Sequence, residues 1–368
     1  MSYVPSRFTY RMVIFLTSLV CSTGAARDQW TPAEANHWYA QQPWLVGSNF
    51  NPSTAINQLE MWQADTFDLP TINRELGWAE SLGMNTIRVY LHDLLWQQDS
   101  AGFLQRMEQF LEVADRHGIC VMFVHFDSVW NPHPKLGKQP DPTPHVHNSG
   151  WVQSPGVKIL KDPDRYDSLQ AYVQGVIGHF RDDSRILCWD LFNEPDNTNN
   201  NSYGSEEPEN KALLALGLLK KSYRWARAAN PSQPITSAAW IGDWADPVSR
   251  WMLEQSDIVT FHNYEDLASV KRRVAYLRKL GRPILCSEYM ARPKGSTFQA
   301  ILPYFKQEKI GAYNWGFVAG KSQTIYPWET WLKTYTAEPQ VWFHDIFRTD
   351  GTPYDESEVK FIRELTGG

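Results

Sequence analysis

The feature of this sequence that most constrains its fold is a regular alternation between short β-rich runs and amphipathic helical stretches. Several of the runs are nearly continuous apolar segments, which is typical of parallel strands covered on both faces. The stretches between them carry apolar residues at helical spacing, as with Ile72, Leu76 and Ala79. The predicted strands span residues 44–50, 85–91, 120–126, 186–192, 234–240, 258–264, 283–289 and 311–318.

Eight strand–helix units in succession predict an α/β fold, a closed (β/α)8 TIM barrel. The alternative is an open doubly wound sheet, which would have a Gly-rich turn after its first strand. The residues at that position, Gly47-Ser48-Asn49, do not make such a turn. A length of 368 residues suits a single large domain, and no linker, low-complexity tract or appended binding module is evident.

The N-terminus has the pattern of an export signal. Arg7 and Arg11 precede an apolar run over residues 12–20, and small residues then offer a cleavage site before Arg27. The run is too short to span a bilayer comfortably, and a merely apolar N-terminal tail is the alternative. We therefore expect a secreted or periplasmic protein, free of the membrane after cleavage, with a signal peptide over residues 1–26 and one folded domain over residues 27–368.

Charge and aromatic content narrow the class of partner. The net charge of −6 gives no electrostatic reason to expect nucleic acid or an anionic membrane as a partner. Trp, Tyr and Phe together make 14% of the chain. These rings either enlarge the core or stack on the apolar faces of sugars in a binding groove.

Neither the cysteines nor the loop histidines predict a metal site. Cys120, Cys188 and Cys286 lie inside apolar strand-like runs without zinc spacing, so we expect them to be buried and unpaired. The three histidines within residues 133–147 lie in an irregular, Pro-rich segment that has no helix or ribbon to fix ligand geometry. We expect neither a metal nor a cofactor.

Two connections are unusually long, and both follow a predicted strand. Residues 127–164 follow the third strand and residues 319–355 follow the eighth. Loops that follow strands lie on the C-terminal face of a barrel, where active sites are built. Asp127 and Trp130 come directly after the third strand and could form one wall of a binding site.

Two glutamates end predicted strands that lie across the barrel from each other. Glu194 follows Asn193 at the end of the fourth strand, and Glu288 ends the seventh. Cleavage of a glycosidic bond needs two carboxyl groups, one to protonate the leaving oxygen and one to attack the sugar or activate water. Either glutamate alone could equally be solvated or salt-bridged, but the pair in this setting indicates a glycoside hydrolase.

The motifs at these strand ends resemble those of clan A glycoside hydrolases, and most closely those of glycoside hydrolase family five, the cellulase and mannanase family. The resemblance extends over essentially the whole mature chain and implies a TIM barrel. Asn193-Glu194-Pro195 matches the Asn-Glu-Pro that supplies the acid/base in that family. Glu288 matches the Glu at the end of strand seven that supplies the nucleophile.

The same resemblance implies supporting roles for other side chains. Arg88, at the end of the second strand, would hydrogen-bond the nucleophile, and Trp315, at the end of the eighth, would form the floor of the cleavage subsite. His262 and Tyr264 match a His-x-Tyr after strand six, and His125 matches a His on strand three. The expected substrate-binding residues are Arg88, His125, Trp130, Asn193, His262, Tyr264 and Trp315.

These assignments imply a retaining enzyme that cleaves β-glycosidic bonds in a plant-type or related β-glycan or oligosaccharide by double displacement. We expect residues 27–368 to be the catalytic domain and to act as a monomer. Exo action and transglycosylation use the same residues and stay open, as does the identity of the sugar. A carbohydrate-binding barrel that has lost catalysis fits less well, because both carboxylates are present.

Overall fold

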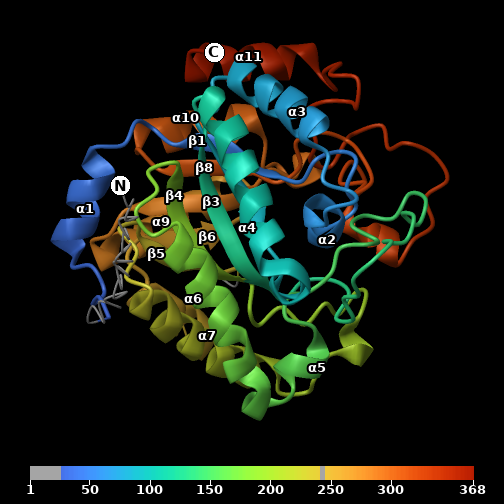
Figure 1. Cartoon of the computed structure of the whole chain (residues 1–368). Helices are drawn as coiled ribbons and strands as arrows, with labels where there is room; N and C mark the ends of the chain where they lie inside the picture. The colour runs from blue at the N-terminus through green and yellow to red at the C-terminus, as the bar shows by residue number, and fades with distance from the viewer. Residues whose placement is uncertain (1–25, 241–244) are drawn as a thin grey trace, which may run out of the picture.

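Eight parallel strands form the centre of the molecule, as the sequence pattern predicts (Figure 1). The computed structural model describes residues 26–240 and 245–368, so the predicted signal peptide lies almost wholly outside the described residues. Consecutive strands are hydrogen-bonded neighbours from β1 to β5 and from β6 to β8, and β1 also pairs with β8. The strands are β1 (Val46–Phe50), β2 (Thr86–Tyr90), β3 (Cys120–Asp127), β4 (Ile186–Asn193), β5 (Ile235–Ala238), β6 (Val259–His262), β7 (Ile284–Tyr289) and β8 (Gly311–Asn314).

The ring is completed between β5 and β6 by a weaker set of contacts. A single parallel bridge joins Ala239 to Phe261. The hydroxyl of Thr236 also donates to the carbonyl of Ile258 and lies 2.9 Å from the hydroxyl of Thr260. All eight strands thus enclose one barrel, which confirms the predicted (β/α)8 architecture.

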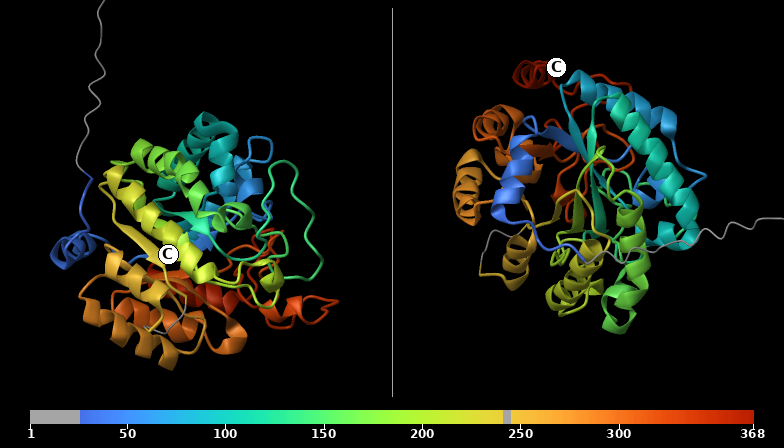
Figure 2. Two further views of the ribbon diagram at one scale, coloured as in Figure 1. Left: turned by 90° about the horizontal axis from the view of Figure 1, so that it is seen from below. Right: turned by 60° about the vertical axis from the view of Figure 1, so that its left-hand side comes forward.

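Helices surround the strands on the outside (Figure 2). Many of them begin at an Asp or Thr whose side chain accepts a hydrogen bond from a backbone N–H of the first turn, as at Asp68, Asp246, Asp266, Thr297 and Asp355. The helices that follow β1 to β8 around the barrel are α3 (Leu69–Ser81), α4 (Asp93–Arg116), α6 (Gln170–His179), α7 (Lys211–Ala228), α8 (Pro247–Gln255), α9 (Leu267–Leu277), α10 (Phe298–Gln307) and α11 (Glu356–Thr366). The additional helices are α1 (Pro32–Ala40), α2 (Gln58–Trp62) and α5 (Val157–Leu160).

Helix α1, for which the sequence made no prediction, covers the N-terminal end of the barrel. Tyr39 belongs to a buried cluster with Met122, Leu285 and Tyr313, which come from β3, β7 and β8. The hydroxyl of Tyr39 donates to the carbonyl of Lys309 at 2.8 Å. The helix therefore closes the end of the barrel that lies away from the strand carboxyl termini.

The two long connections lie together at the opposite end, at the right of Figure 1. The side chain of Gln323 accepts from the backbone N–H of His145 and donates to the carbonyls of Thr143 and Val146. The indole of Trp331 donates to the carbonyl of His147 at 2.8 Å. The connection after β3 and the connection after β8 are therefore one joined structure above the strands.

The three cysteines and the helices of the described chain bear on disulfide formation and on membrane association. Cys120, Cys188 and Cys286 are free thiols; Cys188 and Cys286 are fully buried and Cys120 is partly buried. In the described part of the chain, no helix has the length and apolarity that crossing a membrane requires.

Candidate active site

A cleft of about 790 Å³ opens at the C-terminal end of the barrel. Its lining comes from the ends of β3, β4, β6 and β7 and from the connections that follow β3, β4, β5, β6 and β8. Arg88 lies beneath this surface and is fully buried. The predicted site residues that line the cleft are Trp130, Asn193, Glu194, His262, Tyr264, Glu288 and Trp315.

Glu288 lies on β7 and accepts hydrogen bonds from three side chains. The guanidinium of Arg88 donates to Oε1 at 2.7 Å, and the hydroxyl of Tyr90 donates to the same oxygen at 2.8 Å. The hydroxyl of Tyr264 donates to Oε2 at 2.6 Å. Donors on both oxygens, one of them a cation, stabilise the ionised carboxylate.

Glu194 directly follows β4 and has a different environment. Its backbone lies in the left-handed region with φ of 43°, which is uncommon for a residue other than glycine and recurs at functional sites. Nδ1 of His262 lies 2.6 Å from Oε1, and the amide of Asn197 donates to Oε2 at 2.7 Å. Burial raises the pKa of Glu194 to about 7, so a large fraction of the molecules keep this carboxyl group protonated at neutral pH.

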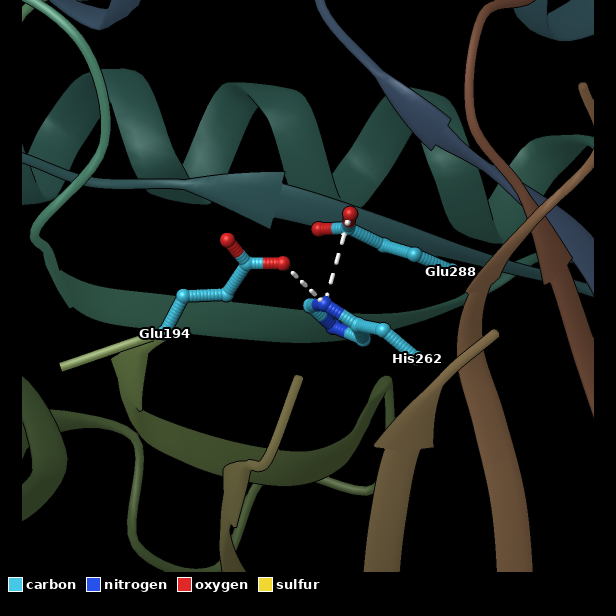
Figure 3. Close-up of side chains that lie close together, drawn as sticks. All are labelled: Glu194, His262 and Glu288. Carbon is cyan, nitrogen blue, oxygen red and sulfur yellow. Dashed lines mark hydrogen bonds and ion pairs between the residues drawn. The ribbon is translucent and has the colours of Figure 1, made fainter. Parts of the chain in front are cut away.

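The two carboxylates approach each other closely, with His262 between them (Figure 3). One oxygen of Glu194, one oxygen of Glu288 and a ring nitrogen of His262 all lie within 4.8 Å of one another. Burial lowers the pKa of His262 to about 4, so its imidazole is neutral at neutral pH. The site therefore combines a carboxyl group that holds a proton with a second carboxyl group whose oxygens accept three hydrogen bonds.

Arg88 connects four strands from below the cleft. Besides Glu288, its guanidinium donates to Asp190 at 2.8 Å on β4 and to Asn49 at 2.9 Å on β1. It also donates to Oδ1 of Asn193 at 2.7 Å. A fully buried guanidinium needs acceptors for its N–H groups, and these side chains supply them.

Asn193 is held in one orientation by hydrogen bonds to both ends of its amide. Oδ1 accepts from Arg88, and Nδ2 donates to Oδ1 of Asp127 at 3.0 Å. Asp127 also accepts from the indole of Trp151 at 2.6 Å, and burial raises its pKa to about 7. Together these two hydrogen bonds fix the direction of both N–H groups on Nδ2 of Asn193.

Aromatic rings form much of the cleft surface. Trp315 is partly exposed, and its ring packs edge-on against Tyr90 and Trp151, each at a centroid distance of 5.9 Å. Trp130, after β3, stacks on Trp331 at 5.5 Å, which joins the two long connections. Flat, partly exposed rings of this kind suit the apolar faces of sugars.

The structure does not bring His125 to the cleft. Its side chain on β3 is fully buried outside the barrel lumen, where it packs against Tyr172 of α6 and Trp189 of β4 at 5.5 and 5.4 Å. Burial without a hydrogen-bond partner lowers its pKa to about 3. Neighbouring positions on a strand point to opposite faces, and His125 is on the face that packs against the helices. The expectation that His125 contacts substrate is therefore corrected: its side chain packs in the core.

Within the described ranges, Glu194, His262 and Glu288 form the group whose side chains could share a metal ion. The guanidinium of Arg88 lies 2.7 Å from Glu288, and a positive charge there disfavours a cation. The histidines of the connection after β3 have other partners: His133 pairs with Glu206, and His145 contacts the hydroxyl of Tyr326. The donor set therefore favours proton chemistry over metal binding.

Sequence reasoning missed several residues that complete the site. Tyr90 comes two positions after Arg88 on the same strand. Since side chains alternate between the two faces of a strand, this spacing alone predicts that both lie on one face. Asp190 is a charged residue inside an apolar strand, which is also a signal. Asn197 lies in a polar loop, and nothing in the sequence distinguishes it from its neighbours.

The barrel, the paired carboxylates and the aromatic cleft together define a glycoside hydrolase that acts on β-glycans. A family model described as Cellulase (glycosyl hydrolase family 5) matches residues 47–320. That range includes both glutamates and all eight strands except Val46, the first residue of β1. The chain belongs to glycosyl hydrolase family 5. None of the curated protein sequences compared with the chain matches it.

Solved structures of low sequence identity share the fold. GH5_18 from Streptomyces cattleya, in complex with GlcNAc, has a TM-score of 0.57 and 12% identity over 88% of this chain and 79% of that chain. A β-1,4-mannanase from the sea hare Aplysia kurodai has a TM-score of 0.55 and 17% identity over 75% and 88% of the two chains. An exo-β-1,4-mannosidase from Opitutaceae bacterium strain TAV5 has a TM-score of 0.55 and 18% identity over 88% and 60%.

Proposed function

We propose that the protein is a retaining β-glycosidase in which Glu194 is the acid/base and Glu288 is the nucleophile. The observation that carries the proposal is the approach of the two carboxylates, one oxygen of each lying within 4.8 Å of one oxygen of the other. Retaining enzymes have carboxyl groups about 5–5.5 Å apart, whereas inverting enzymes need about 6.5–9.5 Å to admit water between them. The approach therefore supports direct attack by a carboxylate on the sugar.

In the first step, Glu288 attacks the anomeric carbon of a sugar seated beside Trp315. Arg88, Tyr90 and Tyr264 donate hydrogen bonds that position the attacking carboxylate. Glu194 gives its proton to the leaving oxygen as the glycosidic bond breaks. The product of this step is a sugar joined to Glu288 through an ester bond.

In the second step, Glu194 acts as a base. It has lost its proton, and the donors from Asn197 and His262 stabilise its charge. Glu194 then takes a proton from water, the water oxygen attacks the anomeric carbon, and Glu288 leaves as a carboxylate. The directed N–H of Asn193 would bind the 2-hydroxyl, a contact that strengthens as positive charge develops on the ring.

The identity of the sugar that the protein cleaves is to be determined with a panel of substrates. Two of the structures similar to this chain are named as a β-1,4-mannanase and an exo-β-1,4-mannosidase. β-Mannosides therefore come first in the panel, followed by β-glucosides, β-xylosides and β-galactosides. Aryl glycosides, oligosaccharides and polysaccharides of each sugar should be compared.

Glu194→Gln and Glu288→Gln test the pair directly. Loss of an acid/base group lowers kcat by about 10²–10⁴-fold, and loss of a nucleophile by about 10⁴-fold or more. Glu364→Gln, on the exposed face of α11, is a matched control that should keep the wild-type rate. No hydrolysis of any substrate by the wild-type protein, or wild-type rates in both site variants, would contradict the assignment.

Proton NMR of the first product tests retention separately. The anomeric signal should have the β configuration before mutarotation mixes the anomers. An α anomer as the first product would exclude Glu288 as nucleophile while leaving the glycosidase activity intact.

A further inference from the structure

A buried ion pair lies behind the polar loop that follows β4. Nζ of Lys211, at the start of α7, lies 2.7 Å from Oε1 of Glu207, and the two side chains are only 1% and 3% exposed. The ammonium also donates to the carbonyl of Ser128 at 2.7 Å, just after β3. Lys211 and Glu207 are not among the described residues that line the cleft, so any effect of the pair on a substrate must pass through other residues.

Three donors converge on one oxygen of Glu207. Besides Lys211, the side-chain amides of Asn199 and Gln153 donate to Oε1, each at 2.6 Å. Asn199 belongs to the connection after β4, and Gln153 belongs to the connection after β3. The carboxylate therefore holds the two connections together behind the cleft, and Lys211 supplies the charge that a buried carboxylate needs beside it.

One branch from Glu207 leads to the proposed acid/base. The backbone N–H of Asn199 donates to Oδ1 of Asn197 at 2.9 Å. Nδ2 of Asn197 in turn donates to Oε2 of Glu194 at 2.7 Å. An amide has one donor end and one acceptor end, so the bond from Asn199 fixes which end of Asn197 faces Glu194. Glu207 is therefore linked to the acid/base through two asparagines.

A second branch leads to Trp130, whose ring lines the cleft. Its backbone N–H donates to Oδ1 of Asn199 at 2.7 Å, and its carbonyl accepts from Nε2 of Gln153 at 2.9 Å. The backbone of Trp130 lies in the left-handed region with φ of 70°, a conformation that a bulky residue keeps only where its surroundings hold it. Both branches from Glu207 thus end at residues that line the cleft.

The positive charge of Lys211 acts on the same carboxyl group. Burial raises the pKa of Glu194, while the hydrogen bond from Asn197 and the charges of Arg88 and Lys211 lower it. Lys211 therefore favours the ionised form of Glu194 from the side of α7. The other titratable groups around Glu194 are Asp127 at the end of β3, Asp196 on its own loop, His262 on β6, Tyr264 after β6 and Glu288 on β7.

We propose that the Lys211–Glu207 ion pair is a positioning unit for proton transfer, which holds Asn197 in the orientation that binds Glu194 and brings a positive charge to that side of the site. This inference rests on the proposed function, because it takes Glu194 as the acid/base. Glu194 must direct its proton at the leaving oxygen in the first step and carry a negative charge in the second. Apolar residues of similar volume often stabilise a fold as well as a buried ion pair does, so a role in the reaction accounts for this pair better than stability alone.

Proton transfer is tested with the double variant Lys211→Met/Glu207→Leu and two substrates of the sugar that the panel selects. An oligosaccharide has a leaving oxygen that needs a proton, whereas the leaving group of a dinitrophenyl β-glycoside departs as an anion without one. We expect kcat/KM to fall by about 10-fold or more on the oligosaccharide and to stay within about 3-fold on the dinitrophenyl glycoside. A merely structural defect would lower both values alike. Equal losses on the two substrates, or no loss on the oligosaccharide, would overturn the proposal.

The double variant is designed to fold. It leaves no charge unpaired at the site, and its apolar side chains replace the ion pair with groups of similar volume. Asn199 and Gln153 lose Glu207 as an acceptor, but each keeps a second one, the carbonyls of Ser128 and Trp130.

The role of the charge is tested with the single variants Lys211→Met and Glu207→Gln, by measuring kcat/KM on the oligosaccharide against pH. Loss of the cation should raise the pKa of Glu194 and move the alkaline limb to higher pH by about 0.5 unit or more. Glu207→Gln keeps the cation and an acceptor oxygen but removes the negative charge, so the limb should move to lower pH. Limbs that stay at the wild-type position, or that move in the same direction in both variants, would contradict the role of the charge.

Lys221→Met/Asp167→Leu is the matched control. Lys221 lies about 15 Å further along α7 and pairs with the exposed side chain of Asp167 at 2.5 Å. This control should match the wild type on both substrates and keep the same alkaline limb. If the wild type cleaves both substrates and the test variants behave as the control does, the inference fails and the proposed function stands. If the wild type cleaves neither substrate, the proposed function itself fails.

Discussion

The proton on Glu194 is controlled by neighbours with opposite effects. Burial raises the pKa of this carboxyl group to about 7, while the hydrogen bond from Asn197 and the charges of Arg88 and Lys211 lower it. The acid form is needed in the first step and the base form in the second. A value near neutrality lets one group serve both steps.

The pH profile of the enzyme should therefore fall on its alkaline side as Glu194 loses its proton, near pH 7. Asn197→Ala removes a donor that favours the charged form, so the pKa of Glu194 rises and the alkaline limb of kcat/KM moves to higher pH. The measurement is kcat/KM against pH on an aryl glycoside. A limb that moves to lower pH in Asn197→Ala, or stays in place, would contradict this control of Glu194.

Arg88 is the second residue on which the site depends. Arg88→Lys keeps a positive charge but cannot reach the forked set of acceptors on Asp190, Asn193 and Glu288. We expect kcat to fall by about 10²-fold or more, as when a preorganised donor is lost. Arg88→Ala leaves buried carboxylates uncompensated and should destabilise the fold by about 3–5 kcal/mol. Kinetics and thermal unfolding of both variants check this, and a wild-type kcat in Arg88→Lys would refute it.

At the residue scale, the sequence predicted the side chains that lie at the end of a strand. It missed those whose role depends on contacts with residues distant in the sequence or in a loop. Glu194 and Glu288 could be found because each ends a recognisable strand. Asn197 could not, because its hydrogen bond to Glu194 depends on how the polar loop after β4 turns back over the cleft. His125 was misplaced because its strand was recognised but the face it occupies was not.

At the scale of elements, all eight predicted strands are present, since apolar runs flanked by helical stretches are an unambiguous pattern. Their observed ends differ mainly at β5, β6 and β8, where the prediction extended into the turns after the strands. Helix α1 was not foreseen because it mixes polar and aromatic residues and precedes the alternating units. Its position depends on the open end of the barrel, which exists only in three dimensions.

Helix α1 should contribute to stability and leave catalysis unchanged, because it lies at the opposite end of the barrel from the cleft. Tyr39→Ala removes a buried ring and the hydrogen bond to Lys309, and should destabilise the protein by about 3–5 kcal/mol. Tyr39→Phe removes only the hydrogen bond, which contributes about 1 kcal/mol. Thermal unfolding should rank the two variants, and kcat and KM at low temperature should match the wild type. A changed KM in the folded variants would show that α1 influences the cleft.

At the scale of the whole molecule, buried ionisable groups set how stability depends on pH. Burial raises the pKa of several carboxyl groups to about 6–7, so between about pH 4 and 7 the folded protein holds protons that the unfolded chain has lost, and stability falls as pH rises through that range. Burial lowers the pKa of several imidazoles from 6.5, so stability also falls as pH drops below about 6.5. The carboxyl groups are Glu75, Asp127, Glu194, Asp196 and Asp345, and the imidazoles are His125, His147, His262 and His344.

The melting temperature should therefore be highest between about pH 4 and 6.5, where the two sets oppose each other, and lower at pH 8 and below pH 4. Glu75 is remote from the cleft and allows a clean test. Glu75→Gln removes one group whose pKa is raised from 4.5 to about 7, so the loss of stability between those two pH values should shrink. Thermal unfolding at each pH, with Glu364→Gln as the matched control, measures this. An unchanged slope in Glu75→Gln would argue against the assignment.

The hydrogen bonds that join the connection after β3 to the connection after β8 also limit how the rim of the cleft can change. Gln323 and Trp331 of the second connection bind residues 143–147 of the first, so neither connection can shift without breaking contacts with the other. An exchange of loops with a related enzyme, made to alter what the cleft accepts, should therefore replace both connections together.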